Sequence, residues 1–308
     1  MTHLDFLNQN YPIRKSQEQK NAFREYIIEY LSKKGIEAKV ERTTDGKNDN
    51  IVIGDPEKAA VVYTAHYDTP AMSLFPNIMI PKNMLVFFAY QFVPVIFLLV
   101  VSLAVAYLVG IVLFNDTTVY MLTFLVMYYG LFFLIMRGFP NPYNYNDNTS
   151  GVATVLSIID GLNDAEREKV AFILFDNEEK GKKGSAAYYK DHKEIMQDKF
   201  LVNFDCVGNG DNIIFIAQGE AAKSRKFKLL EESFEVSDDF VLDFCTYKEG
   251  SSNSDHKNFP KGVACVACKK KGGLLYTPNI HTKYDTVVNN ANIDFLAKNT
   301  CNFTRNIR

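Results

Sequence analysis

The residues of this sequence that could perform chemistry are histidines and carboxylates concentrated in five short segments. These segments are His66-Tyr67-Asp68, Asn146-Asp147-Asn148, Glu178-Glu179, Asp205 and His281. The first four come at or next to the ends of predicted strands or at the start of a predicted helix. In open α/β sheets, ligands bind at the edge formed by the carboxyl ends of the strands. We therefore expect these side chains to meet at one site.

The residue types in these segments indicate a site for divalent metal ions. Two histidines and three carboxylates can hold two such ions, and nitrogen and oxygen ligands without thiolates suit zinc, with cobalt or manganese as substitutes. Asp147 opens a predicted helix and could be only an N-cap, but its two oxygens could also be shared between two cations. The adjacent Glu178 and Glu179 repel each other unless a cation or a shared proton is present, which favours one ligand and one base.

Each candidate also has a purely structural interpretation. His66 could be a capping core residue, Asp205 a turn-forming residue and His281 an ordinary loop histidine. Asp68, two residues after His66, is well placed to bind the second imidazole nitrogen, as groups behind zinc-bound histidines commonly do. Outside these segments, His3 is expected in a frayed terminus.

The elements that must position these residues alternate between strands and helices. Predicted strands cover 37–42, 50–54, 59–65, 169–175, 200–204, 213–217, 240–244 and 262–268, and predicted helices cover 16–34, 149–162, 185–196, 222–234 and 292–305. The strand at 59–65 is almost continuously apolar, as expected when helices cover both faces of a sheet. The pattern predicts a three-layer α/β/α domain with a mostly parallel, mixed sheet.

A long apolar stretch interrupts this pattern. Residues 84–114 and 117–136 contain no charged residue, and only Asn115 and Asp116 separate them. About 20 apolar residues span a bilayer core. We therefore predict a transmembrane helical hairpin at 82–139 that divides a catalytic domain into the parts 1–81 and 140–308. The alternatives are two helices buried in a soluble core, or an apolar lid used for dimerisation.

Charge and composition predict an integral membrane protein with a cytoplasmic catalytic domain. Lys82 and Arg137 flank one end of the hairpin and the turn carries only Asp116, so the positive-inside rule places the soluble part in the cytoplasm. The first 20 residues contain no signal-peptide core, and five irregularly spaced cysteines fit a reducing compartment. A net charge of −2 without a basic, aromatic-interleaved cluster argues against a nucleic-acid partner.

The chain resembles a metallopeptidase family, the secreted bacterial leucyl-type di-zinc aminopeptidases, to which glutamate carboxypeptidase, the transferrin receptor ectodomain and glutaminyl cyclase are similar. The resemblance is carried by six motifs in family order, namely HYDT, NDNTSGVA, FDNEEKGKKGS, NFDCVG, SDHKNF and HTKYDT. It covers residues 59–68 and 141–295. The resemblance implies the zinc-dependent exopeptidase fold, here interrupted by the hairpin.

The resemblance also implies a metal-binding role for five residues. Asp147 would bridge two Zn²⁺ ions. His66 and Asp205 would complete the first site, and Glu179 with His281 would complete the second.

Further roles implied by the resemblance concern catalysis and the pocket. Glu178 would be the general base, and Asp68 would orient His66. A motif that lines the pocket in relatives is matched by Ser254, Asp255 and His256, which would support the site without binding metal.

The sequence departs from the family at two points. The stretch between His66 and Asp147 is short in relatives, whereas here it contains the whole hairpin. Relatives often have Tyr immediately before the last histidine, where this chain has Ile280. Tyr276 or Tyr284 would then have to take its place beside the oxyanion.

The predicted function is removal of N-terminal residues from peptides with a free amino group, by a metal-bridging water with Glu178 as base. The alternatives are an amidohydrolase or carboxypeptidase on the same scaffold, a one-zinc glutaminyl cyclase, and a catalytically silent, receptor-like binding protein. Intramembrane proteolysis is not expected, because the apolar stretches contain no ionisable residues. The expected partners are a peptide and the lipid bilayer, and the sequence does not indicate an oligomeric state.

Overall fold

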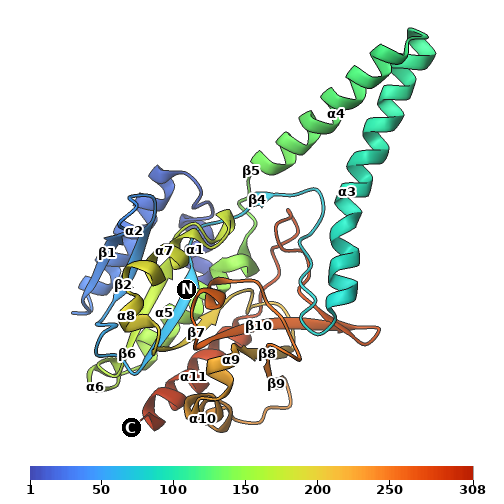
Figure 1. Ribbon diagram of the computed structural model, residues 1–308. Helices are drawn as coiled ribbons and strands as arrows, with labels where there is room; N and C mark the ends of the chain where they lie inside the picture. The colour runs from blue at the N-terminus through green and yellow to red at the C-terminus, as the bar shows by residue number, and fades with distance from the viewer. Residues whose placement is uncertain (308) are drawn as a thin grey trace.

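A computed structural model describes residues 1–307, with the side chains of residues 135–137 outside the description. The described chain forms an α/β domain from which a long helical hairpin projects (Figure 1). The hairpin is inserted between β4 (Ala71–Met72) and β5 (Phe139–Pro140), which pair antiparallel. The predicted α/β fold is confirmed.

A nine-stranded mixed sheet forms the middle layer of the domain. Its strands lie in the order β1-β2-β6-β3-β7-β10-β8-β9, and β11 pairs with β10. The central strands β6, β3, β7 and β10 are parallel, β8 and β9 are parallel to each other, and the remaining pairings are antiparallel. The bounds are β1 (Ala38–Arg42), β2 (Asp49–Ile53), β3 (Val61–His66), β6 (Val170–Phe175), β7 (Phe200–Phe204), β8 (Asn212–Ala217), β9 (Val241–Thr246), β10 (Gly262–Lys271) and β11 (Leu274–Tyr276).

Helices cover both faces of this sheet. Their bounds are α1 (His3–Asn10), α2 (Gln17–Ser32), α5 (Gly151–Gly161), α6 (Asp164–Arg167), α7 (Lys183–Asp191), α8 (Lys193–Met196), α9 (Gly219–Ala222), α10 (Arg225–Ser233) and α11 (Asn290–Asn306). Tyr63 of β3 lies in the core that contains residues of α2, α5 and α11. Its neighbour Val62 points to the other face and packs in the core that contains Tyr188 of α7. This alternation explains why every residue of β3 is buried.

Most predicted elements are present, and three differ for local reasons. The capping box of Ser16 and Gln19 begins α2 as predicted. The expected frayed terminus is wrong, because His3 lies in α1 and its Nε2 is 2.9 Å from Asp160. The helix predicted at 185–196 is divided at His192, and β10 extends three residues further because β11 pairs with its end.

The hairpin consists of α3 (Met84–Ala106), which continues as a wider helical turn through Leu113, and α4 (Thr117–Arg137). Both are long and apolar enough to cross a membrane. Only 22% of an 18-residue apolar stretch in the first helix is buried, and none of the corresponding stretch of α4 is buried. Neither is therefore a core helix. A Cβ atom on Gly110 would lie 2.2 Å from Cα of Tyr120, so the helices approach closely near the turn. Figure 1 shows them separating towards the domain.

The segment between β4 and α3 runs beside the loop that carries His281. The amide of Ser73 donates to the carbonyl of His281 at 2.7 Å, and that of Asn77 donates to the carbonyl of Ile280 at 3.1 Å. Nζ of Lys82 lies 2.9 Å from Asp243 of β9. The start of α3 is therefore fixed to the α/β domain.

Candidate metal centre

His66 and Asp205 meet because they end neighbouring parallel strands. His66 is the last residue of β3, and Asp205 directly follows β7. His66 Nε2 lies 3.7 Å from Asp205 Oδ1 and 3.4 Å from Asp147 Oδ1. His66 is thus next to two of the carboxylates that the sequence predicts beside it.

A second group of side chains lies on the other side of Asp147. His281 Nε2 is 2.9 Å from Asp147 Oδ2 and 3.4 Å from Glu179 Oε2. The two oxygens of Asp147 therefore face different histidines. The five predicted ligands form two overlapping groups, each able to hold an ion and each including Asp147.

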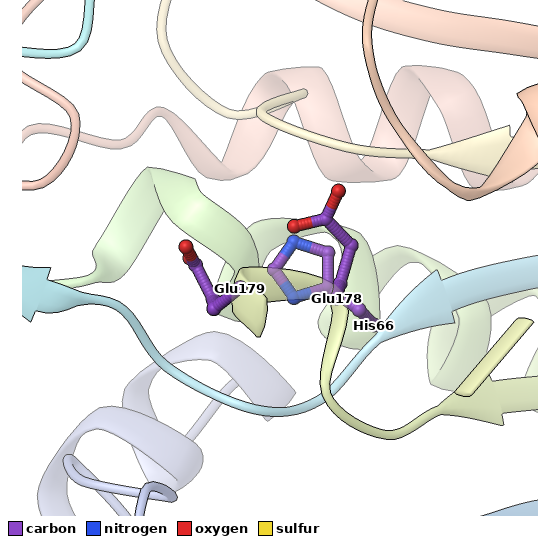
Figure 2. A group of neighbouring side chains, drawn as sticks. All are labelled: His66, Glu178 and Glu179. Atoms are coloured by element: carbon purple, nitrogen blue, oxygen red, sulfur yellow. The ribbon is translucent and has the colours of Figure 1, made fainter. Parts of the chain in front are cut away.

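Glu178 precedes Glu179 and also lies beside His66. Both residues belong to a short helical turn after β6. Figure 2 shows the His66 ring between the two glutamates, and ligand atoms of all three residues lie within 4.8 Å of one another. Burial raises the pKa of Glu178 well above its usual value. The pKa of Asp147 is shifted in the opposite direction. Burial alone would raise it, but hydrogen bonds with His281 and His66 outweigh burial and lower it.

The cluster contains buried oxygens that no described protein group satisfies. Glu179 Oε1 and Asp205 Oδ1 are buried and have no hydrogen-bond partner, an arrangement that costs free energy unless another group binds them. Burial raises the pKa of Glu179 to about 8. Burial alone would lower the pKa of His281, but the nearby Glu179 and Asp147 raise it to about 9. Protons can thus neutralise the cluster, and so could divalent cations.

The thiol nearest the cluster does not alter this ligand set. Burial raises the pKa of the Cys206 thiol well above its usual value, and Cys206 belongs to neither of the two groups of ligand atoms that include Asp147. The chemistry of the site is that of nitrogen and carboxylate oxygen, which fits zinc.

Asp68 acts differently from the expectation. Its carboxylate accepts hydrogen bonds from the amides of Glu178 and Glu179, at 2.9 and 3.2 Å. The hydrogen bond at His66 Nδ1 is made by the Asp68 backbone carbonyl, at 3.1 Å, while the nearer carboxylate oxygen is 3.5 Å away. Asp68 thus holds both the histidine and the turn that carries the two glutamates.

Asp285 is a residue of this site to which the sequence reasoning gave no role. Its carboxylate accepts hydrogen bonds from the amides of Asn146 and Asp147, at 3.2 and 3.0 Å. Burial, and next the charge of Asp147, raise its pKa to about 8. The available signal was its place in the motif HTKYDT, four residues after His281.

The segment Ser254-Asp255-His256 lies behind the site rather than along its cavity. Ser254 accepts a hydrogen bond from Asn203 at 2.9 Å, and Asp255 accepts one from Ser185. Both ring nitrogens of His256 are buried without a partner, and burial lowers its pKa to about 3. The cavity wall is formed instead by the preceding residues 251–253.

A cavity of about 490 Å³ opens above the cluster. Asp147, Glu178, Glu179, Asp205 and His281 line one side of it. The remaining wall includes Asn77, Met79, Ile80, Lys182, Lys257 and the first turns of α3. The inserted hairpin therefore contributes residues to the wall of this cavity.

The expected tyrosine substitutes do not reach this cavity. Ile280 is buried and lines it, whereas Tyr276 and Tyr284 are not among the lining residues. Tyr284 is largely exposed.

Comparison with known proteins places the fold. Residues 140–304 match the sequence model described as peptidase family M28. No curated protein matches the chain.

Solved structures similar to the chain share its fold at low sequence identity. The Legionella pneumophila LapA aminopeptidase has a TM-score of 0.59 and 13% identity, covering 98% of this chain and 67% of its own. Bacteroides thetaiotaomicron glutaminyl cyclase bound to N-acetylhistamine has a TM-score of 0.59 and 15% identity, covering 99% and 96%. A Zn-dependent exopeptidase from Parabacteroides distasonis has a TM-score of 0.59 and 13% identity, covering 99% and 96%.

Proposed function

The chain belongs to peptidase family M28, and we propose that it is a metal-dependent aminopeptidase that uses two zinc ions. The observation that carries this proposal is the position of Asp147 between His66 and His281, with one oxygen towards each histidine. Zinc would be held by His66, Asp205 and Asp147 at one site, and by His281, Glu179 and Asp147 at the other. When bound, such ions lower the pKa of water and polarise a carbonyl group.

Glu178 is the residue we assign to proton transfer. Its carboxylate lines the cavity, and burial raises its pKa, so it can both accept a proton from water and return it to a leaving amine. Asp68 fixes the backbone of Glu178 and of its neighbour Glu179. The remaining chain groups hold ligands in place: Asp285 binds the amide of Asp147, and the His281 carbonyl is tied to Ser73.

A carboxypeptidase is the second candidate, and one observation favours it. Lys182 and Lys257 line the cavity and could bind a terminal carboxylate. Nζ of Lys182 already donates to Asn253 at 2.8 Å, and burial lowers the pKa of Lys257, which leaves the free-amine substrate as our first choice.

A panel of substrates tests the assignment. Purified protein is dialysed against chelator, reconstituted with Zn²⁺, Co²⁺ or Mn²⁺, and given aminoacyl anilides, their N-acetylated forms, C-terminally free blocked peptides, and a peptide with N-terminal glutamine. An aminopeptidase hydrolyses only the unblocked anilides and binds two metal ions per chain. Cleavage of blocked peptides at their C-terminus would support the carboxypeptidase, and cyclisation of glutamine with one zinc would support a glutaminyl cyclase. A folded protein that binds no metal would be a receptor-like protein.

We also propose that the hairpin spans a bilayer with the catalytic domain in the cytoplasm. The apolar helical stretch Met84–Leu113, which is α3 with its continuation, has 30 residues and α4 has 21, corresponding to about 45 and 32 Å of helix, and a bilayer core is about 30 Å thick. Lys82 at the domain side supports this orientation. The protein should be extracted by detergent but not by alkaline carbonate. A protease added to the cytoplasmic face should digest the catalytic domain and leave the hairpin, with its turn around Asp116, protected.

A further inference from the structure

We propose that α3 guides bilayer-associated peptides from the membrane surface into the catalytic cavity. The substrate class would be peptides with a short free N-terminal segment followed by an apolar segment that partitions into the bilayer. This inference rests on the proposed aminopeptidase function and on the hairpin crossing a bilayer.

The first observation is that α3 is part of the cavity wall. Met84, Phe87 and Phe88, from its first two turns, line the same cavity as Glu178 and His281. A helix that served only as an anchor would not need to enter the catalytic site. The fixed start of α3, where Asn83 caps the helix and Lys82 pairs with Asp243, keeps these side chains at the cavity.

The second observation is an apolar stripe that continues from the cavity along α3. Leu85, Phe88 and Phe92 are 81, 56 and 62% exposed, and their spacing of three and four residues places them on one face of the helix. Exposed Val95 and Leu99 extend this face towards the turn of the hairpin. Phe88 belongs both to the stripe and to the cavity wall, so the two surfaces are continuous.

The third observation is that the apolar helical stretch Met84–Leu113, which is α3 with its continuation, has 30 residues whereas α4 has 21. If α4 spans the bilayer core, the longer apolar helix has about ten residues left over on the domain side, or about 15 Å. Residues 84–93, which include Phe88 and Phe92, therefore lie between the bilayer and the cavity. About five residues of extended peptide cover this distance.

These observations together select the occupant. The stripe is too close to the domain to be covered by lipid along its whole length, and large apolar side chains in water are unfavourable by about 25 cal/mol per Å². A peptide that leaves the bilayer beside α3 would cover Phe92 first and Phe88 last, ending with its amino group at the metal centre. A second copy of the chain is the competing occupant.

The experiment compares two peptides with the full-length protein in phosphatidylcholine vesicles. One is a soluble octapeptide that begins with leucine, and the other is the same octapeptide followed by a 20-residue leucine-alanine tail. The double variant Leu85→Ser/Phe92→Ser changes exposed residues that do not line the cavity. It should cleave the tailed peptide about tenfold more slowly, as expected from losing two large apolar contacts, and cleave the soluble peptide at the wild-type rate.

Two controls make the result specific. Val93→Ser changes a residue that is 42% exposed beside Phe92 but on another face, and it should leave both rates unchanged. Shortening the segment before the tail below about five residues should abolish cleavage of the tailed peptide by the wild type. Thermal unfolding of each variant checks that the fold is intact.

The outcomes distinguish failure of the proposed aminopeptidase activity from failure of the proposed guiding role of α3. If the wild type cleaves neither peptide with any of the three metals, the aminopeptidase proposal fails. If it cleaves the soluble peptide but the double variant slows both peptides equally or neither, the guiding role of α3 is wrong. A change in oligomeric mass of the double variant in detergent, with unchanged cleavage, would identify the stripe as a subunit interface and would also overturn the inference.

Discussion

The backbone amide of Asp147 donates a hydrogen bond to the carboxylate of Asp285, at 3.0 Å. The same carboxylate accepts from the amide of Asn146. Asp285 thus fixes the backbone of the residue whose two oxygens face His66 and His281. The hydrogen bonds described for its carboxylate come from these two backbone amides and from neither histidine, so we regard it as a positioning residue.

The first prediction concerns this positioning. Asp285→Asn replaces one accepting oxygen with an amide donor, so one of the two backbone amides loses its partner. Metal affinity should fall by about 10- to 100-fold, the usual effect of changing a group behind the ligands. Competition with a zinc indicator measures the change. Asp294→Asn, at an exposed position of α11, is the control and should bind metal normally.

The second prediction separates proton transfer from metal binding. Glu178→Gln keeps the shape of the side chain but cannot accept a proton, so kcat should fall by about 10²- to 10⁴-fold while metal content stays at the wild-type value. Exposed Glu168→Gln should be unchanged in both. A Gln variant with normal turnover would mean that Glu178 is not the base.

The third prediction concerns the pH dependence of the metal-free protein. Folding raises the pKa of Glu179 from 4.5 to about 8 and that of His281 from 6.5 to about 9. A raised pKa gives stability that is fully present below the unfolded value and is lost as the pH rises through the folded value. The free energy of unfolding of the metal-free protein should therefore decrease between about pH 5 and 9.

Metal binding should reverse this trend, because cations replace the protons of the cluster. Urea unfolding at several pH values measures the first effect. Proton release on adding zinc at pH 7, detected with a weakly buffered indicator, measures the second. Metal-free stability that rises steadily from pH 5 to 9 would contradict the prediction.

The fourth prediction concerns the hairpin. Met72 and Phe139 are paired in the β4–β5 ladder, so residues 73–138 can be replaced by Asn-Gly, which favours a two-residue turn. The product should be soluble without detergent. It should lose preference for leucyl over alanyl anilides by about tenfold, because the apolar wall that includes Ile80 and Met84 is gone.

The same excision also removes the contacts of residues 73 and 77 with the His281 loop. A matched variant that retains residues 73–83 and shortens only the hairpin distinguishes these effects. If both variants keep the wild-type leucyl preference, α3 does not shape the cavity.

Much of the α/β domain was predictable because its strands are apolar and are followed by histidine or carboxylate residues. His66 and Asp205 could be placed at the same edge of the sheet from sequence alone, since the carboxyl ends of parallel strands share one edge. The order of those strands could not, because it depends on pairing between distant segments.

What the sequence did not reveal are contacts between loops. Asp285 reaches the amide of Asp147 only through the tertiary path of its loop, and no periodicity reports that path. The entry of Met84 and Phe88 into the cavity depends on how the inserted helix leaves the domain. The helix at His3–Asn10 was missed because its local capping box, Thr2 with Asp5, lies at the very start of the chain.

The position of β3 has a consequence for biosynthesis. This strand lies between β6 and β7, yet the ribosome makes the whole hairpin before either partner. At usual translation speeds, β3 waits on the order of ten seconds for β6. If the hairpin crosses a bilayer as we propose, its insertion would therefore come before closure of the sheet. A nascent chain in which the hairpin was made but β6 and β7 were not would expose an unpaired apolar strand to chaperones and proteases.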